Sequence, residues 1–167
     1  QVGRFRIPPD GSKLRSPNTM SHRPQTPEGR LRVSAILPAF NEADRIGATL
    51  ASLRTLDTVD EILVVDDGSK DRTSEVARSH GATEVVRLER NHGKGRALTA
   101  GLERATGDVL LFLDADLGET AKEAHQLLVP VFEGEADMTI AVLPRPAKRG
   151  GMGFVLRAAQ EGIERAT

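Results

Sequence analysis

The sequence predicts an α/β fold in which a mostly parallel β-sheet is flanked by helices on both faces. From residue 31 onward, short apolar runs alternate with amphipathic stretches at the spacing of strand–helix units. The apolar runs are short and nearly continuous, which is typical of strands buried on both faces of a parallel sheet. At 167 residues, the chain is long enough to bury the core of one such domain.

The first strand–helix unit follows residue 31. Residues 33–37 are predicted to form a buried strand, which Pro38 ends because proline cannot donate to a β-ladder. Asn41 comes next and is a candidate cap for the following helix. That helix is expected to bury one apolar face, formed by Ile46, Leu50 and Leu53.

The second and third strands are predicted at residues 61–65 and 84–88. A polar helix ending near residue 79 is expected between them, and Gly81 is placed to break it. The next helix, at 93–105, carries small residues at helical spacing on one face, namely Ala97, Gly101 and Ala105. This helix is therefore expected to pack closely on the sheet.

The rest of the chain continues the same alternation. Residues 108–113 form the most apolar of the predicted strands. The elements expected after it are a helix at 120–132, a strand at 137–142 and a terminal helix near 154–166. No internal repeat accompanies this pattern, so the strand–helix units are read as parts of one sheet.

The first 30 residues differ in composition from the rest of the chain. They are rich in Pro, Ser, Arg and Gly and have almost no apolar periodicity. Such a segment cannot bury enough apolar surface to offset the entropy lost on ordering. We therefore expect residues 1–30 to be disordered and residues 31–167 to form the folded domain.

Overall composition excludes several classes of function. A net charge of -1 gives no general attraction to nucleic acid. The absence of cysteine excludes disulfides and thiolate chemistry and fits a reducing compartment such as the cytoplasm. No apolar run approaches the roughly 20 residues of a membrane-spanning helix. Aromatic residues make up only 3% of the chain, so a sugar ligand would be held by polar groups and metal rather than by stacking.

Three polar clusters directly follow predicted strands. They lie at residues 38–42 (PAFNE), 66–69 (DDGS) and 114–116 (DAD). In an open parallel sheet, ligands bind in the crevice beyond the carboxyl ends of the strands. Separate loops that converge on one edge indicate a binding site more strongly than any one of them alone.

Asp114 and Asp116 give the sharpest of these signals. Two carboxylates that face one crevice repel each other unless a cation lies beside them. Mg²⁺ and Mn²⁺ prefer oxygen ligands, and Mg²⁺ commonly binds one or two carboxylates together with substrate phosphates. The alternative is a pair of exposed turn aspartates, since Asp is common in turns.

Two further clusters have both a functional and a structural interpretation. In residues 66–69, Asp and Gly can form a turn with Ser69 capping the next helix, or an acidic side chain can bind a base or ribose. Residues 91–96 (NHGKGR) open a helix with two glycines and two cations, which suits phosphate binding but also suits a solvated basic turn. Their spacing does not match the Walker pattern.

Taken in order, these motifs resemble those of the family 2 glycosyltransferases, in particular the polyprenyl- or dolichyl-phosphate sugar transferase branch. The matching segments are residues 36–42, residues 64–69 with Asp71 and Thr73, residues 91–95 and residues 113–117. The resemblance implies a GT-A fold, which is Rossmann-like. It also implies that the nucleotide-sugar-binding domain at 31–167 is incomplete at its C-terminus, with the acceptor half missing beyond the glycine-rich residues 149–154.

The resemblance assigns the nucleotide-sugar-binding residues. Pro38, Ala39 and Glu42 would line the nucleoside pocket. Asp67 would hydrogen-bond the base or ribose, and Lys94 would lie near the base and the phosphates.

The same resemblance assigns the metal ligands and the catalytic residue. Asp114 would contact the nucleotide and the metal. Asp116 would be catalytic by binding the Mg²⁺ or Mn²⁺ ion that bridges the pyrophosphate. Such an ion neutralises charge on the departing nucleoside diphosphate, while an acceptor oxygen attacks the sugar's anomeric carbon.

The function implied is transfer of a sugar from a UDP- or GDP-linked donor to an acceptor such as a polyprenyl phosphate. The expected location is cytoplasmic or peripheral at the inner face of a membrane, with no nucleic-acid partner. One alternative is a donor-binding fragment or pseudoenzyme that binds nucleotide without turnover. Another is a nucleotidyltransferase, which should carry a glycine-rich loop where residues 38–42 read PAFNE.

Overall fold

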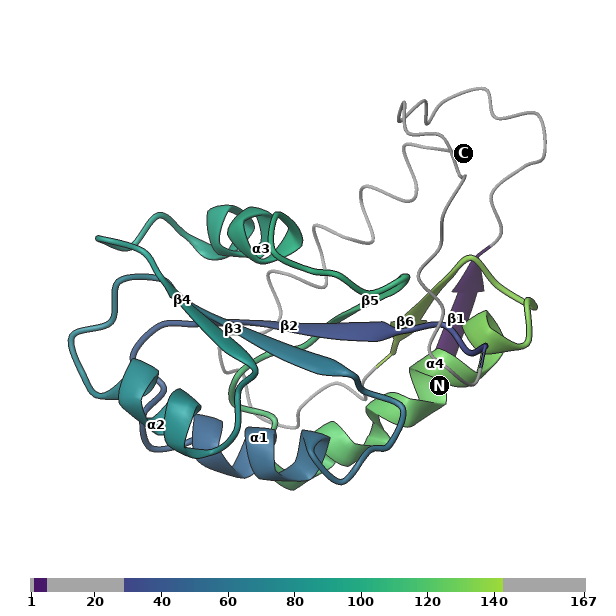
Figure 1. The fold of residues 1–167 in the computed structure, drawn as a ribbon, viewed down its shortest axis with the longest axis horizontal. Coiled ribbons are helices and arrows are strands. Elements are labelled where there is room, and N and C mark those ends of the chain that lie inside the picture. The colour runs from purple at the N-terminus through teal and green to yellow at the C-terminus, as the bar shows by residue number, and fades with distance from the viewer. Residues whose placement is uncertain (1, 6–28, 143–167) are drawn as a thin grey trace.

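A four-stranded parallel sheet lies at the centre of the molecule (Figure 1). The structure, a computed structural model, describes residues 2–5 and 29–142. The strands stand in the order β4-β3-β2-β5. Their bounds are β2 (Val33–Ala39), β3 (Glu61–Asp66), β4 (Glu84–Arg87) and β5 (Val109–Phe112). The predicted α/β architecture with a mostly parallel sheet is confirmed.

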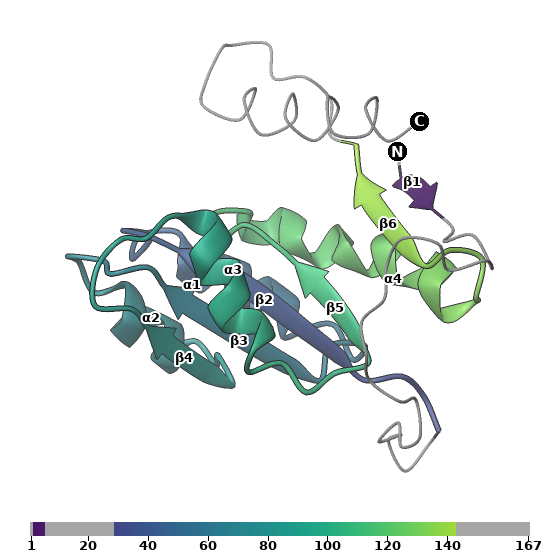
Figure 2. The same ribbon diagram turned by 90° about the horizontal axis from the view of Figure 1, so that it is seen from above.

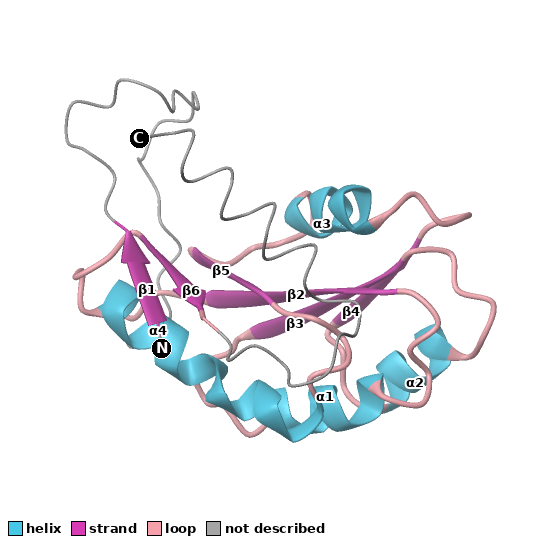
Figure 3. Ribbon diagram, turned by 180° about the vertical axis from the view of Figure 1, so that it is seen from behind, coloured by secondary structure: helices cyan, strands magenta, loops and turns pink. Residues whose placement is uncertain are grey.

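Helices cover both faces of this sheet, as Figures 1 and 3 show. Helices α1 (Ile46–Leu53) and α2 (Thr73–Ser79) lie on one face, and α3 (Lys94–Leu102) lies on the other. The helix predicted at 120–132 is divided into a 3-10 segment, η1 (Gly118–Ala124), and α4 (His125–Phe132). Among the residues that the structure describes, no helix has the length and apolarity needed to cross a bilayer.

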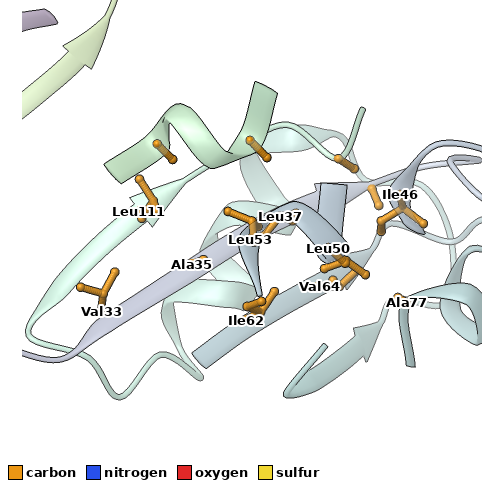
Figure 4. Packing of buried hydrophobic residues seen from close by; sticks show 14 of the residues in the cluster. Val33, Ala35, Leu37, Ile46, Leu50, Leu53, Ile62, Val64, Ala77 and Leu111 are labelled. Atoms are coloured by element: carbon orange, nitrogen blue, oxygen red, sulfur yellow. The ribbon is translucent and has the colours of Figure 1, made fainter. Parts of the chain in front are cut away.

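The main core lies between the sheet and α1. Alternate residues of β2 point toward this helix, and the predicted apolar face of α1 packs against them (Figure 4). Full burial of each large aliphatic side chain contributes about 1.5–3 kcal/mol. The labelled core residues are Val33, Ala35, Leu37, Ile46, Leu50, Leu53, Ile62, Val64, Ala77 and Leu111.

Small residues bring α3 close to the opposite face of the sheet. Ala97 and Gly101 of α3 are buried, as the sequence predicted. A Cβ atom at Gly101 would lie 2.4 Å from Cγ2 of Ile36 and 3.2 Å from Cγ2 of Val65, so only glycine fits without a shift. Ala105 lies beyond the end of the helix and is half-buried, so it is not part of this helical contact.

Strand β2 extends one residue past Pro38 instead of ending before it. The carbonyl oxygens of Val33 and Ala39 accept bonds from the β3 side, whereas that of Ile36 accepts from Leu113 on the β5 side. By this alternation, the nitrogen of Pro38 faces the β5 side, where pairing has already ended at Ile36. The lack of an N–H at Pro38 therefore removes no hydrogen bond between β2 and β5.

The N-terminal segment and the last described strand differ from expectation. Strand β1 (Val2–Phe5) pairs antiparallel with β6 (Met138–Ala141) in a separate two-stranded sheet (Figure 2). The expected disorder of residues 1–30 is therefore wrong for residues 2–5, because backbone groups can pair along a strand edge whatever the side-chain composition. Residues 6–28 and the helix predicted at 154–166 lie outside the described residues.

A buried polar network holds the amino-terminal edge of the sheet. The Glu61 carboxylate accepts hydrogen bonds from the hydroxyl of Ser34 and from the backbone N–H of Thr106, the latter at 2.6 Å. Burial opposes ionisation of Glu61, but these hydrogen bonds outweigh it and hold the pKa of the carboxyl below its usual value. This network belongs to the fold and lies at the end of the sheet opposite the acidic turns.

The packing of α3 predicts the effect of a single methyl group. Gly101→Ala should destabilise the protein by roughly 1–3 kcal/mol, because the added carbon overlaps Ile36. The measurement is urea unfolding monitored by circular dichroism. Gly95→Ala in the same helix is the matched control, since nothing lies within 4 Å of its added carbon. Equal stability of the two variants would show that α3 is free to move away from the sheet.

Candidate functional site

The acidic and glycine-rich turns meet at one edge of the sheet. Because β2, β3 and β5 are parallel, their carboxyl ends lie at this edge. The turns that leave them are residues 40–45, 67–72 and 113–117. The loop at 88–93, which enters α3, joins them there through the contacts described next.

Asn41 links the turn after β2 to the turn after β3. Its backbone N–H donates to the hydroxyl of Ser69 at 2.9 Å, and its side-chain oxygen accepts from the N–H of Lys70 at 2.9 Å. Asn41 has a φ of 56°, a conformation that asparagine tolerates better than most residues. It does not cap α1, whose N-cap is Arg45, so the predicted capping role is wrong. Ser69 likewise does not cap α2.

Asp71 and Thr73 strengthen the same link. Asp71 accepts hydrogen bonds from the N–H of Ala43 at 3.1 Å and from the N–H of Thr73 at 3.0 Å. The Thr73 hydroxyl in turn accepts from the N–H of Glu42 at 2.9 Å. Asp71 is exposed, and its slight desolvation opposes ionisation, but the bonds from Thr73 and Ala43 outweigh this effect and lower the pKa of its carboxyl. Together these contacts fix the backbone that carries Glu42.

The two aspartates at the carboxyl end of β3 are buried and hold neighbouring loops. Asp66 accepts from the N–H of Ser69 at 2.8 Å and from the hydroxyl of Ser74. Asp67 accepts from the N–H of His92 at 2.8 Å and from the N–H of Gly93 at 2.7 Å. Each oxygen of Asp67 thus receives one backbone donor from the loop that enters α3. Its predicted contact with a base or ribose stays a prediction.

Gly68 allows this loop to lie directly on the turn after β3. It has a φ of 73°, and a Cβ atom there would lie 2.4 Å from the carbonyl carbon of Arg90. Gly93, with a φ of 90°, is the N-cap of α3. The two hydrogen bonds that Asp67 accepts from His92 and Gly93 therefore fix the start of α3, and with it the position of Lys94.

Lys94 reaches from α3 to the turn after β5. Its ammonium forms an ion pair with the carboxylate of Asp114. The side chains remain 50% and 37% exposed, so the pair lies at the surface of the site and is open to a ligand. The structure thus brings together two of the residues that the sequence singled out from different motifs.

A buried hydroxyl pins the turn that carries Asp114 and Asp116. Thr49 of α1 donates to the carbonyl oxygen of Ala115 at 2.8 Å and accepts from the N–H of Gly118 at 2.8 Å. Ala115 is buried in the core, whereas Asp114 and Asp116 on either side keep 37% and 38% of their side chains exposed. The turn therefore holds both carboxylates outward from one fixed point.

Arg45 joins Asp116 to Glu42. Its Nη1 lies 3.3 Å from Oδ2 of Asp116, and its Nη2 lies 2.7 Å from Oε2 of Glu42. Burial raises the pKa of Glu42 above its usual value, and the negative charge of Asp116 adds to this, while Arg45 opposes it. Arg45 was not among the predicted site residues, since no motif contains it. Its position three residues after Glu42 was the only signal available.

The carboxylate oxygens of Asp114 and Asp116 suit a divalent ion whose remaining ligands come from a nucleotide. Within residues 2–5 and 29–142, no three His, Asp or Glu side chains form a complete metal site. As predicted ligands, Asp114 and Asp116 would therefore supply only part of a coordination shell. Mg²⁺ is commonly held in this way, by one or two carboxylates with substrate phosphates and water completing the shell.

Pro38 and Ala39 lie at the carboxyl end of β2, at the edge where the acidic turns meet. Ala39 is buried, and its carbonyl oxygen accepts the N–H of Asp67 at 2.8 Å. Pro38 is half-buried. All seven predicted site residues thus belong to the same edge of the sheet or to the loops there.

Comparison with known proteins identifies the family. The chain matches Glycosyl transferase family 2 over residues 34–154, which is most of its length, and it belongs to this family. The matched range contains every turn that forms the site. The GT-A fold is also shared with solved structures.

Two curated proteins are similar in sequence to part of this chain. An undecaprenyl-phosphate 4-deoxy-4-formamido-L-arabinose transferase from Klebsiella pneumoniae is 38% identical over 112 residues, which are 62% of this chain and 34% of that protein. One from Pectobacterium atrosepticum is 36% identical over 111 residues. The chain spans about a third of the length of the curated relatives it matches.

Solved structures give the same fold. Mannosyl-3-phosphoglycerate synthase from Rubrobacter xylanophilus superimposes with a TM-score of 0.56 at 38% identity, covering 62% of this chain and 37% of that one. Glucosyl-3-phosphoglycerate synthase from Mycobacterium tuberculosis, in complex with Mn²⁺, uridine-diphosphate-glucose and phosphoglyceric acid, gives 0.56 at 34% identity, covering 63% and 40%.

The role of Thr49 can be tested directly. Thr49→Val removes the hydroxyl and leaves the Ala115 carbonyl and the Gly118 N–H without their partner, which should cost about 1–3 kcal/mol of stability. Thr49→Ser keeps the hydroxyl and is the control. Chemical denaturation of both variants measures the difference. A valine variant no less stable than the serine variant would contradict the pinning of this turn.

Proposed function

We propose that this chain carries the donor-binding part of a glycosyltransferase that uses a nucleoside diphosphate sugar and Mg²⁺ or Mn²⁺. The observation that carries the proposal is the turn after β5, where Asp114 and Asp116 flank a buried alanine pinned by Thr49. Membership of Glycosyl transferase family 2 supports it. So do the UDP complexes with Mn²⁺ and Mg²⁺ of the M. tuberculosis enzyme.

Asp116 is proposed to bind the metal and is the catalytic residue in that sense, with Asp114 as a second ligand that also contacts the nucleotide. The bound ion supplies positive charge to the pyrophosphate as the sugar departs. Lys94, which pairs with Asp114, is proposed to turn toward the phosphates when the donor binds. Its position at the first residue of α3 supports this, since helix N-termini favour anions.

The nucleoside is proposed to lie over the carboxyl ends of β2 and β3. Pro38, Ala39 and Glu42 would line its pocket, and Asp67 would reach the base or ribose with the acceptor capacity left on its carboxylate. Each oxygen of Asp67 already accepts one backbone hydrogen bond, and a carboxylate oxygen can accept a second. A nucleoside at this position would add to the loop contacts of Asp67.

The acceptor is proposed to carry a phosphate group, with a polyprenyl phosphate as the first candidate. Undecaprenyl phosphate appears in the names of the curated relatives, and phosphoglyceric acid is bound in the M. tuberculosis structure. A lipid acceptor would place the protein in the cytoplasm at the inner face of the membrane. A free phosphorylated acid would require no membrane contact.

Two alternatives make different predictions. A donor-binding fragment or pseudoenzyme would bind nucleotide without transferring or hydrolysing the sugar, which product analysis with a labelled donor decides. A nucleotidyltransferase would need a glycine-rich loop after its first nucleotide-binding strand, whereas β2 leads here into Phe40, Asn41 and Glu42. Family membership also favours transfer over nucleotide-sugar synthesis.

Calorimetric titration of UDP and of GDP, with Mn²⁺ or with excess chelator, tests the proposal. One nucleotide should bind only when Mn²⁺ is present. Asp116→Asn should weaken that binding at least about tenfold, the smallest loss typical of an outer-shell partner, because a proposed metal ligand loses its negative charge. Asp57→Asn, at an exposed acid on the amino-terminal edge of the sheet, is the control and should bind normally. Equally tight binding in chelator, or by the Asp116 variant, would overturn the metal assignment.

A further inference from the structure

Arg45 is a charged residue of the site with no role in the proposal above. It is the last residue before α1 and lies in the turn that leaves β2. Its guanidinium contacts two carboxylates from different turns, Glu42 and Asp116. One of these belongs to the proposed nucleoside pocket and the other to the proposed metal site.

The two contacts of Arg45 are unequal. Nη2 lies 2.7 Å and 2.9 Å from the two oxygens of Glu42, whose side chain is only 17% exposed. Nη1 lies 3.3 Å from the 38%-exposed side chain of Asp116, a distance beyond the usual range for a charged hydrogen bond. Arg45 is thus anchored on Glu42 and held more weakly by Asp116.

The weaker contact competes with a metal. A divalent ion that binds Asp116 must share or replace the positive charge that Nη1 now supplies. An arginine side chain does not lose its proton at any ordinary pH, so the displaced guanidinium keeps its charge. It then needs another anion within reach of an end that stays tethered to Glu42. The pyrophosphate of a donor bound to the same ion is such an anion.

We propose that Arg45 is a resident counter-cation that neutralises Asp116 in the ligand-free protein and turns to the donor phosphates when metal and nucleotide bind. This inference rests on the proposed function and adds to it a phosphate-binding residue that also couples the two ligands. Metal alone must displace the guanidinium from Asp116 and offers it no second anion in exchange. Metal with nucleotide supplies the displaced cation with a partner.

The geometry of arginine suits this role. The guanidinium has five N–H donors in a fixed plane, so it can keep its contact with Glu42 through Nη2 while another N–H contacts a phosphate. The side chain of Arg45 is 57% exposed, which leaves room for such a contact. A lysine has a single ammonium and would have to leave Glu42 in order to follow a phosphate.

The test measures two affinities on the full chain. Electron paramagnetic resonance of free Mn²⁺ gives the affinity for metal alone, and calorimetry at saturating Mn²⁺ gives the affinity for UDP or GDP. Arg45→Met should bind Mn²⁺ alone more tightly, because the competing cation is gone. It should bind nucleotide more weakly, by about fivefold or more, because the phosphate contact is lost.

Two further variants sharpen the test. Arg45→Lys should keep the weak binding of metal alone, because the charge remains, and should only partly restore nucleotide affinity. Arg104→Met is the matched control, since Arg104 is 59% exposed and pairs with Glu84 at 3.0 Å. Glu84 is the first residue of β4 and lies at the opposite edge of the sheet, so neither affinity should change.

The opposite signs of the two effects separate this role from a structural one. A variant that was merely misfolded would lose affinity for both ligands. The proposal is overturned if Arg45→Met fails to raise the affinity for Mn²⁺ alone or leaves nucleotide binding unchanged. In that case metal-dependent nucleotide binding by the wild-type chain would still support the proposed function. Absence of such binding in the wild-type chain would contradict both.

Discussion

Parallel pairing of β2, β3 and β5 is the constraint on which the site depends. Strands that run in the same direction release their following turns at one edge, so three segments far apart in sequence must share a small region. Sharing a region does not by itself fix side chains. That is done by the side-chain oxygens of Asn41, Asp67 and Thr49, each of which accepts a hydrogen bond from a backbone N–H of another segment.

Most of these ties use a side chain on one segment and backbone groups on the other. The exposed carboxylates of Asp114 and Asp116 take no part in these side-chain-to-backbone bonds. Within the part of the chain that the structure describes, they form ion pairs with the side chains of Lys94 and Arg45. The site therefore has a rigid inner layer and a charged outer layer of lysine, arginine and acids. Ion pairs at such exposure contribute little to folding stability, so they can be exchanged for a ligand at little cost.

The fold class and the site edge could be predicted from the sequence because they depend on patterns that are local. Continuous apolar runs located β2, β3 and β5, and the small-residue face located Ala97 and Gly101. The motifs located the residues of the site by their order along the chain. Their proximity then followed from the parallel sheet.

Other features depend on tertiary contacts that no local pattern contains. Asn41 and Ser69 have typical capping side chains, but their partners proved to be each other's turns. The pairing of β1 with β6 uses backbone groups, which any composition provides. Arg45 contacts Asp116 only because the fold brings the turn after β5 beside it. Its second partner, Asp116, lies 71 residues further along the chain.

Two glutamates at opposite ends of the sheet, the half-buried Glu42 and the buried Glu61, have pKa values displaced in opposite directions. Glu42, at the site, has a raised pKa, so on acidification it takes up a proton before an ordinary glutamate does. Glu61, at the other edge, has a lowered pKa. The stability it provides is complete above the pKa of an unfolded glutamate and is lost only as the pH falls through its lower folded value. On acidification, the carboxylate that anchors Arg45 therefore takes up its proton at a higher pH than the carboxylate at the opposite end of the sheet.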